Sequence, residues 1–347
     1  MLSAVMYEKQ DIRLINRNVP EITENEILVK VKCAGICGTD LRIYQNGIPN
    51  VTKHTPRTLG HEFSGVIEKV GKNIRHYKVG MRVSVAPNIG CGVCDTCVEG
   101  NEHLCDQYEA IGIHLDGGFA EYVRIPESAV RSGNVVEIPD HVSFEEAMIV
   151  EPLSCVYNGI QKSNVHLGDT VLIIGAGPIG IMHAMFAKLA GAAKVFITNR
   201  SERRLEIVEQ VDPSFITVPS KNLEADIHRL TNGQGVDVCI TACSDPGAQT
   251  LAVQLVKLNG RVNFFGGLPK DNEMIKMNGN LIHYKQIVVT GTTRSSSGHF
   301  RKTLGLIAAG QLKVDPLITD RYSIQEFDQA LDKAINRTGL KTIITFE

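Results

Sequence analysis

One short stretch restricts the fold more than any other. Five apolar or β-branched residues, Thr170-Val171-Leu172-Ile173-Ile174, are followed at once by the glycine-rich turn Gly175-Ala176-Gly177-Pro178-Ile179-Gly180. The apolar segment from Ile179 to Ala193 then predicts a helix. A glycine-rich turn between a strand and a helix predicts a dinucleotide site, because glycines permit a tight turn and close approach of a pyrophosphate. The residues expected to contact the cofactor are Gly175, Gly177, Pro178, Ile179 and Gly180. A plain strand-to-helix turn is the alternative.

A second strand, Lys194 to Thr198, should end where the ribose of a nucleotide is recognised. An acidic residue at that point binds the 2'-hydroxyl of NAD. This chain instead has Asn199-Arg200-Ser201-Glu202-Arg203-Arg204. Guanidinium groups match phosphate geometry, so Asn199, Arg200 and Arg204 predict that NADP(H) is favoured over NAD(H). The alternative is that these arginines are a solvated helix face.

The rest of the chain indicates two domains. Strands predicted at Val236–Ile240, Arg261–Phe265 and Ile287–Thr290 complete a doubly wound parallel sheet over residues 153–291. Short β-branched runs before about Val85, such as Phe63–Val70, predict a compact β barrel or sandwich. A final strand at 341–346 should return to that first domain, which therefore spans residues 1–152 and 292–347.

Four cysteines are spaced for a closed metal site. Cys91, Cys94, Cys97 and Cys105 follow the pattern C-x2-C-x2-C-x7-C in a lobe at about 88–108. Four thiolates can close a tetrahedron around zinc with no open position, as in structural sites. An iron–sulfur cluster and unliganded thiols are the alternatives. His103 is expected to be a solvated loop residue.

A second metal site is predicted from residues at strand ends. Cys37 follows one predicted strand and His61 precedes another, and a thiolate with an imidazole suits zinc. A catalytic zinc site needs a third protein ligand. Glu151, which lies between an apolar run and Pro152, is the first candidate, and Glu62 competes with it.

Composition excludes several classes of function. The chain has 347 residues, 43% hydrophobic and 21% charged, which is typical of a globular protein. Lys and Arg number 36 against 38 Asp and Glu, so a nucleic-acid partner is not expected. The N-terminus lacks the features of a secretory signal, and the most apolar helix is too short to span a bilayer. Without a membrane partner or export signal, the nine cysteines fit a cytoplasmic metal protein.

Taken together, these motifs resemble those of the zinc-containing medium-chain dehydrogenase/reductase family, and within it the sorbitol (polyol) dehydrogenases. The matching segments are Gly35–Asp40 with Cys37, Gly60-His61-Glu62, the four lobe cysteines, Asp116–Tyr122, Glu151–Ser154 and Gly175–Gly180. The resemblance implies a GroES-like β-barrel catalytic domain, a Rossmann coenzyme domain and a homo-oligomer, either dimer or tetramer. It also implies a zinc carboxylate at Glu151, and a position near substrate and cofactor for Arg294.

The resemblance implies two zinc ions per chain and reversible oxidation of a secondary alcohol. The substrate would be a polyol, a sugar alcohol or its phosphate. Cys37, His61 and either Glu62 or Glu151 would hold the catalytic zinc, with Thr39 as the hydroxyl that relays protons. Two positions depart from the pattern, because Arg42 replaces a histidine and Ile43 replaces a substrate-contacting tyrosine.

Two other functions fit the same sequence. One is a related dehydrogenase acting on threonine or butanediol. The other is a nucleotide-sensing protein that keeps the fold without turnover, since fold does not imply function.

Overall fold

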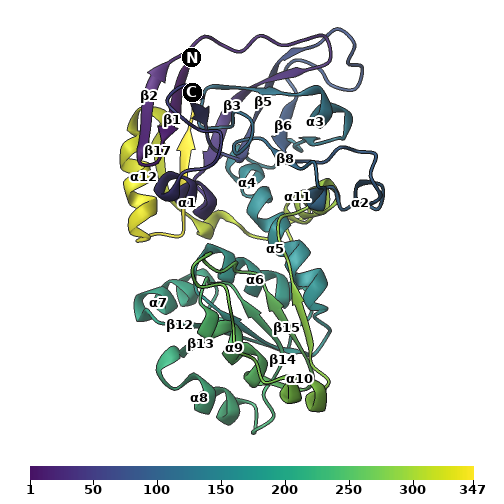
Figure 1. Ribbon diagram of the computed structural model, residues 1–347, viewed down its shortest axis with the longest axis vertical. Helices are drawn as coiled ribbons and strands as arrows, with labels where there is room; N and C mark the ends of the chain where they lie inside the picture. The colour runs from purple at the N-terminus through teal and green to yellow at the C-terminus, as the bar shows by residue number, and fades with distance from the viewer. The chain divides into compact units, whose positions relative to one another are not determined.

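The computed structural model describes all residues, 1–347. Two compact units are present, one formed by Met1–Ser154 with Ser295–Glu347 and the other by Cys155–Arg294. In Figure 1 the purple start and the yellow end of the chain lie in the same unit. Because that unit is built from both ends of the chain, its sheet depends on pairing between residues that are far apart in sequence.

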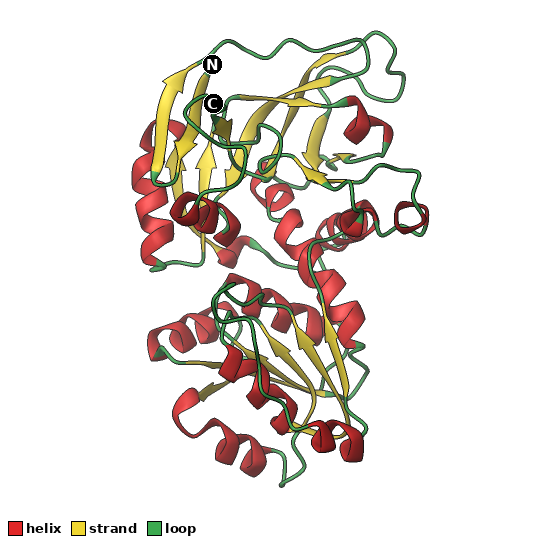
Figure 2. Cartoon of the chain, viewed as in Figure 1, coloured by secondary structure: helices red, strands yellow, loops and turns green.

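The first unit contains the β-rich part of the chain, drawn in yellow in Figure 2. Its seven-stranded sheet has the order β10-β6-β5-β3-β18-β17, with β9 paired to β3. A three-stranded sheet, β2-β1-β4, and a two-stranded sheet, β7-β8, complete it. The strands are β1 Leu2–Glu8, β2 Asp11–Asn16, β3 Ile27–Gly35, β4 Arg57–Thr58, β5 Glu62–Val70, β6 Arg82–Val85, β7 Asn88–Ile89, β8 Glu109–Ala110, β9 Tyr122–Ile125, β10 Val135–Glu137, β17 Ile318–Ser323 and β18 Lys341–Thr345.

The first unit also contains six helices that lie wholly within it. They are α1 Gly38–Asn46, α2 Asp95–Val98, α3 Glu127–Arg131, α4 Phe144–Met148, α11 Ser297–Ala308 and α12 Phe327–Asn336. Helix α12 packs its apolar face on the barrel core, where the rings of Phe119 and Phe327 meet edge to face with centroids 5.2 Å apart. Strand β18 pairs with β3 and β17, so the final strand predicted from the sequence is confirmed to within one residue.

The second unit is a six-stranded sheet of parallel strands in the order β13-β12-β11-β14-β15-β16. This order is that of the doubly wound dinucleotide-binding fold, in which ligands bind where the strand order reverses. Here the reversal lies between β11 and β14. The strands are β11 Thr170–Ile174, β12 Lys194–Asn199, β13 Ile216–Pro219, β14 Val236–Thr241, β15 Val256–Phe264 and β16 Val288–Gly291. Helix α5 Val150–Ser163 begins in the first unit and ends in the second, and the other helices of the second unit are α6 Pro178–Leu189, α7 Glu202–Val211, α8 Leu223–Leu230, α9 Pro246–Leu255 and α10 Gly279–Lys285.

Strand β15 starts earlier than the sequence predicted. It begins at Val256 rather than Arg261 and contains Asn259, whose φ of 59° is left-handed. The pairing with β14 shifts register in this region, which indicates a β-bulge. The bulge interrupts the alternation of side chains, so the sequence pattern showed only the second half of the strand.

Helix α6 follows the glycine turn and packs one face on the second unit. It has 12 residues, and seven of them are buried. No helix in the protein combines the length and the apolar character needed to cross a membrane.

One buried residue of α6 is polar. His183 is fully buried, and neither ring nitrogen has a hydrogen-bond partner. Its ring lies edge to face against Phe265 with centroids 4.6 Å apart, and a side chain at Gly159 would collide with it. Burial lowers the pKa of His183 to about 3, so the folded protein keeps the imidazole neutral.

We predict that His183→Met stabilises the protein and weakens its sensitivity to acid. In the unfolded chain the imidazole of His183 binds a proton with a pKa near 6.5, whereas in the folded chain its pKa is about 3. The neutral His183 therefore does not reduce the free energy of unfolding above pH 6.5. As the pH is lowered from 6.5 to 5, the free energy of unfolding falls by about 2 kcal/mol. Urea unfolding at several pH values measures this loss, and the exposed His76 supplies the control variant His76→Gln. Equal pH slopes for wild type and His183→Met would contradict the prediction.

Candidate functional site

The four-cysteine lobe forms a compact group of sulfur atoms. Its base is the β7–β8 pair, and helix α2 carries Cys97 and has Cys94 as its N-cap. Cys91 and Cys97 have their sulfurs 4.0 Å apart, and those of Cys94 and Cys105 are 3.8 Å apart. Ligands at about 2.3 Å in a tetrahedron around one zinc ion are separated by about 3.8 Å. The donor set and its spacing therefore fit a single zinc ion.

Two backbone amides point at one sulfur of this lobe. Cys91 and Gln107 donate their N–H groups to the sulfur of Cys105 at 3.4 and 3.3 Å. The expectation that His103 is solvated is wrong, because its side chain is 2% exposed. Its ring lies 5.8 Å from that of His299 on α11, so the lobe is packed against that helix.

Three of the predicted catalytic ligands come together in the first unit. The sulfur of Cys37, one nitrogen of His61 and one carboxylate oxygen of Glu62 lie within 4.8 Å of one another. Cys37 is the N-cap of α1, and Glu62 opens β5 opposite Gly35 of β3. The pairing of β3 with β5 thus brings the two sequence motifs to one sheet end. The predicted ligand Glu151 is not part of this group of three, although it is buried near the start of α5.

Asp40 orients both metal-ligand candidates. It accepts a hydrogen bond from the backbone N–H of Cys37 at 2.8 Å, and its other oxygen lies 3.3 Å from Nδ1 of His61. This contact is close but is not an aligned hydrogen bond. It leaves Nε2 as the nitrogen for a metal, an arrangement common among zinc-bound histidines. Burial lowers the pKa of His61, but the charges of Asp40 and Cys37 outweigh burial and raise it well above its usual value.

Sequence reasoning missed the cation beneath these ligands. Lys341, at the start of β18, is 4% exposed, forms an ion pair with Glu62 and donates to the carbonyl of Ile36 at 3.1 Å. Burial lowers the pKa of the Lys341 ammonium, and the Glu62 carboxylate reverses this and raises it. A side chain at Gly35 would collide with this pair. The only signal in the sequence is a lysine that opens a buried β-branched strand.

Thr39 lies in the first turn of α1, beside the metal-ligand candidates. Its hydroxyl accepts a hydrogen bond from the guanidinium of Arg42 at 3.3 Å. Arg42 is exposed, whereas Ile43 is buried in the barrel core. The two departures from the family pattern therefore have different surroundings.

The glycine turn has the geometry that the sequence requires. Gly175 has a φ of 123°, which an L side chain rarely adopts, and a side chain at Gly180 would strike the carbonyl of Gly175. Gly177 is the N-cap of α6, with Pro178 in its first turn. The N–H of Ala176 donates to the amide oxygen of Asn199 at 3.4 Å. Asn199 therefore joins the end of β12 to the turn that precedes α6.

The predicted arginines differ in exposure. Arg200 is exposed and Arg204 is half-buried in the first turn of α7. Arg294 has a left-handed φ of 56°. The side-chain amide of Asn158 on α5 donates to the carbonyls of Thr293 and Arg294 at 3.3 and 3.0 Å.

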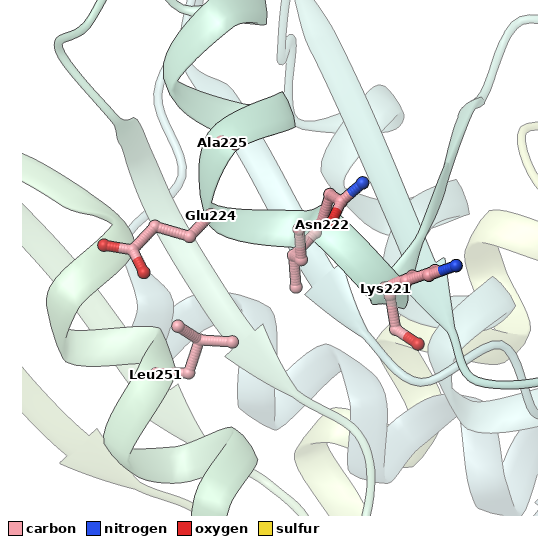
Figure 3. A pocket seen from close by; sticks show the side chains of 7 residues that line it. Lys221, Asn222, Glu224, Ala225 and Leu251 are labelled. Carbon is pink, nitrogen blue, oxygen red and sulfur yellow. The ribbon is translucent and has the colours of Figure 1, made fainter.

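A shallow pocket lies elsewhere on the second unit. Its volume is about 440 Å³, and residues 220–225 with Leu251 line it between the end of β13 and α9 (Figure 3). None of the predicted metal ligands or nucleotide contacts belongs to it. We therefore do not assign the chemistry of the chain to this pocket.

Comparisons with known proteins agree with both units. The family described as alcohol dehydrogenase GroES-like domain matches residues 23–140, and that described as zinc-binding dehydrogenase matches residues 178–309. A sorbitol dehydrogenase from Bacillus subtilis (strain 168) is 33% identical over 338 residues, covering 96% of this chain and 94% of the relative. An L-threonine 3-dehydrogenase from Bacillus licheniformis is 33% identical over 317 residues, covering 90% and 89%. A solved structure of a zinc-binding dehydrogenase from Sinorhizobium meliloti 1021 bound to NADP is 31% identical, with a TM-score of 0.91 and 99% of both chains covered.

The pair of Lys341 and Glu62 leads to a prediction about metal dependence. In Lys341→Met, Glu62 keeps its buried charge without a cation, which should cost about 3 to 5 kcal/mol in metal-free protein. Zinc supplies a replacement cation, so the loss should be smaller in zinc-loaded protein. Urea unfolding with added zinc and with chelator measures both values.

Two further variants make this test specific. Adding Glu62→Gln to Lys341→Met should recover much of the lost stability, because the uncompensated charge is removed. Lys53→Met breaks an ion pair with Glu8 at the surface and should have little effect. A Lys341→Met protein as stable as wild type in chelator would show that the pair has no such role.

Proposed function

This chain belongs to the zinc-binding dehydrogenases and is an NAD(P)-linked alcohol or polyol dehydrogenase, and we propose that its metal centre is formed by Cys37, His61 and a carboxylate. Its reaction interconverts a secondary alcohol and the corresponding ketone. The observation that carries the assignment of the centre is the convergence of Cys37, His61 and Glu62 within 4.8 Å. We assign metal chemistry to the first unit, Met1–Ser154 with Ser295–Glu347, and nucleotide binding to the second unit, Cys155–Arg294.

The residues present fit zinc. Oε1 of Glu62 is a buried polar atom without a hydrogen-bond partner, and a thiolate, an imidazole and a carboxylate form a donor set that zinc accepts. Zinc bound there supplies Lewis-acid chemistry that makes a substrate hydroxyl more acidic. The third ligand is Glu62 or Glu151, and the carboxylate that is not a ligand is available to hold a proton or a water.

The chain supplies a short proton path beside the centre. Asp40 fixes the orientation of His61, and the hydroxyl of Thr39 is the group placed to pass a proton outward. Arg42 donates a hydrogen bond to the hydroxyl oxygen of Thr39, so one lone pair of that oxygen is not available to accept a proton. A bound nicotinamide cofactor would supply the redox chemistry, and the protein would hold the cofactor and the substrate.

The four-cysteine lobe takes a second, structural zinc ion. Its four sulfurs leave no open position, whereas the Cys37 centre keeps one for substrate. The protein therefore carries two zinc ions per chain with different lability.

The substrate is a polyol, a sugar alcohol or a sugar-alcohol phosphate. The exposed guanidinium of Arg42 beside Thr39 supports an anionic group on the substrate, because guanidinium binds phosphate in two-point contacts. The similarity to a threonine dehydrogenase at 33% identity makes an amino-acid alcohol the second candidate.

NADP(H) is the favoured cofactor. Asn199 carries no charge at the position where a carboxylate would repel a 2'-phosphate, and Arg200 beside it is exposed. Solved relatives bind either cofactor, since one from Sinorhizobium meliloti holds NADP and one from Escherichia coli holds NADH, so the preference rests on Asn199 and Arg200.

The protein assembles as a homo-oligomer, a dimer or a tetramer. Strand β16 is at the edge of the second unit's sheet, and an unprotected edge is a template for pairing with another chain. Exposed apolar side chains accompany this edge, because Val288 is 52%, Leu258 69% and Tyr284 74% exposed.

An activity screen tests the proposed function. Polyols, sugar-alcohol phosphates, threonine and butanediol are incubated with NAD or NADP, and reduced cofactor is followed by its absorbance. We expect turnover of at least one polyol or its phosphate, and we expect chelation to abolish it before the protein unfolds. Turnover of threonine alone would reject the substrate assignment, and full activity with about one zinc per chain would reject the second metal site.

The cofactor preference has its own test. One charge-assisted bond to the 2'-phosphate contributes about 1.5 to 3 kcal/mol, so NADP should be favoured by roughly tenfold or more in kcat/KM. The double variant Asn199→Asp, Arg200→Leu should shift the ratio toward NAD. Arg203→Leu, in the first turn of the adjacent helix α7, is the matched control. A wild-type protein that already favours NAD would refute the assignment.

A further inference from the structure

A row of buried polar groups joins the four-cysteine lobe to the first turn of α5. At the base of the lobe, Tyr108 donates its hydroxyl to the side-chain oxygen of Asn88 at 2.7 Å. The side-chain amide of Asn88 donates to the carbonyl of Ser295 at 2.8 Å. The hydroxyls of Ser295 and Ser154 are 2.7 Å apart, and that of Ser154 donates to the carbonyl of Glu151 at 2.7 Å.

These contacts are shielded from water. Asn88 is 5% exposed, Ser295 2% and Ser154 0%. The hydroxyl of Ser154 has one proton and donates it to the carbonyl oxygen of Glu151. The hydroxyl of Ser295 must therefore donate the hydrogen bond that joins it to Ser154. Each buried polar group in the row therefore has a partner, and removing one leaves its neighbour unsatisfied, which costs more than a solvated bond does.

The four-cysteine lobe also contacts the start of α11, two residues after Ser295. Glu102 of the lobe accepts the backbone N–H of Ser297 at 2.5 Å, at the first residue of α11. A carboxylate is favourable at a helix N-terminus, because the unpaired N–H groups there carry partial positive charge. Residues Ser295 to Ser297 are thus held between the lobe and α5.

We propose that Asn88, Ser295 and Ser154 position the turn that carries Glu151, so that the four-cysteine lobe sets the geometry of the catalytic metal centre. The proposal rests on the function assigned above, in which Glu151 serves that centre as ligand or proton acceptor. These three are positioning residues, because none is itself assigned to the metal or substrate. The structural metal then has a catalytic consequence, since it fixes the lobe from which Asn88 and Tyr108 extend.

The decisive comparison uses two serines of the same helix. Ser154→Ala removes the link to Ser295, whereas Ser163→Ala removes a similar buried bond, from Ser163 to the carbonyl of Gly159 at 2.7 Å, at the other end of α5. Protein with cobalt(II) exchanged into the labile site reports its ligand geometry through visible absorption. We expect Ser154→Ala to shift that spectrum and to lower kcat about tenfold, with KM for the cofactor unchanged. Ser163→Ala should match wild type in all three.

A second pair of variants changes the lobe without touching α5. Tyr108→Phe removes only the hydroxyl that bonds Asn88, and its control is Tyr77→Phe, whose hydroxyl bonds the carbonyl of Val135 at 3.0 Å. Tyr108→Phe should lower kcat roughly threefold and move the cobalt spectrum in the same direction as Ser154→Ala. Because the row acts as a unit, the double variant Tyr108→Phe, Ser154→Ala should lose less activity than the product of the single losses.

The outcomes separate this inference from the proposed function. Wild-type protein that takes up no cobalt outside the four-cysteine lobe, or reduces neither NAD nor NADP, overturns the proposed function. Active, cobalt-loaded wild type with Ser154→Ala indistinguishable from Ser163→Ala overturns the positioning role alone. A Ser154→Ala protein that does not fold leaves the decision to Tyr108→Phe, where identity with Tyr77→Phe overturns the role.

Discussion

The buried pair of Lys341 and Glu62 is the constraint on which the first unit depends. A lysine that is 4% exposed must meet its carboxylate, because an unpaired buried charge is far more costly than any single contact around it. A slip of one residue in the pairing of β18 with β3 would turn Lys341 to the opposite face. The pair therefore fixes the register of the last strand, and with it the return of the chain to its first domain.

The same pair makes sense of the charges around the metal-ligand candidates. The carboxylates of Glu62 and Asp40 contact the side chains of Lys341 and His61. Metal binding requires a deprotonated Cys37, and a divalent cation would then balance the charges of this thiolate, the two carboxylates and Lys341. Without one, the excess negative charge raises the pKa of His61, since protonation of the imidazole supplies part of the missing positive charge. The donor set is thus electrostatically incomplete without a divalent ion.

Features coded by short spacings could be predicted from the sequence, and features formed by long-range pairing could not. The glycine turn after Ile174 and the four lobe cysteines follow from residues that are neighbours in the chain. Lys341 was missed because its partner Glu62 belongs to a different strand, and a lysine at a strand start is ordinarily solvated. His103 was misplaced for a similar reason, because its burial comes from packing beside His299 of α11. Local patterns identify donors, while tertiary pairing decides which charges and rings surround them.

The backbone of Arg294 is strained, and tertiary contacts with α5 hold it in that conformation. A left-handed φ of 56° costs a non-glycine residue about 1 kcal/mol or more, and such strain persists where the surroundings determine it. Here Asn158 of α5 binds the carbonyls of Thr293 and Arg294, and Ser154 of the same helix meets the hydroxyl of Ser295. Glycine would adopt this backbone without strain but would have no guanidinium. The use of arginine at a strained position held by α5 therefore supports a role for its side chain, and the helix whose first turn carries Glu151 also holds the segment that carries Arg294.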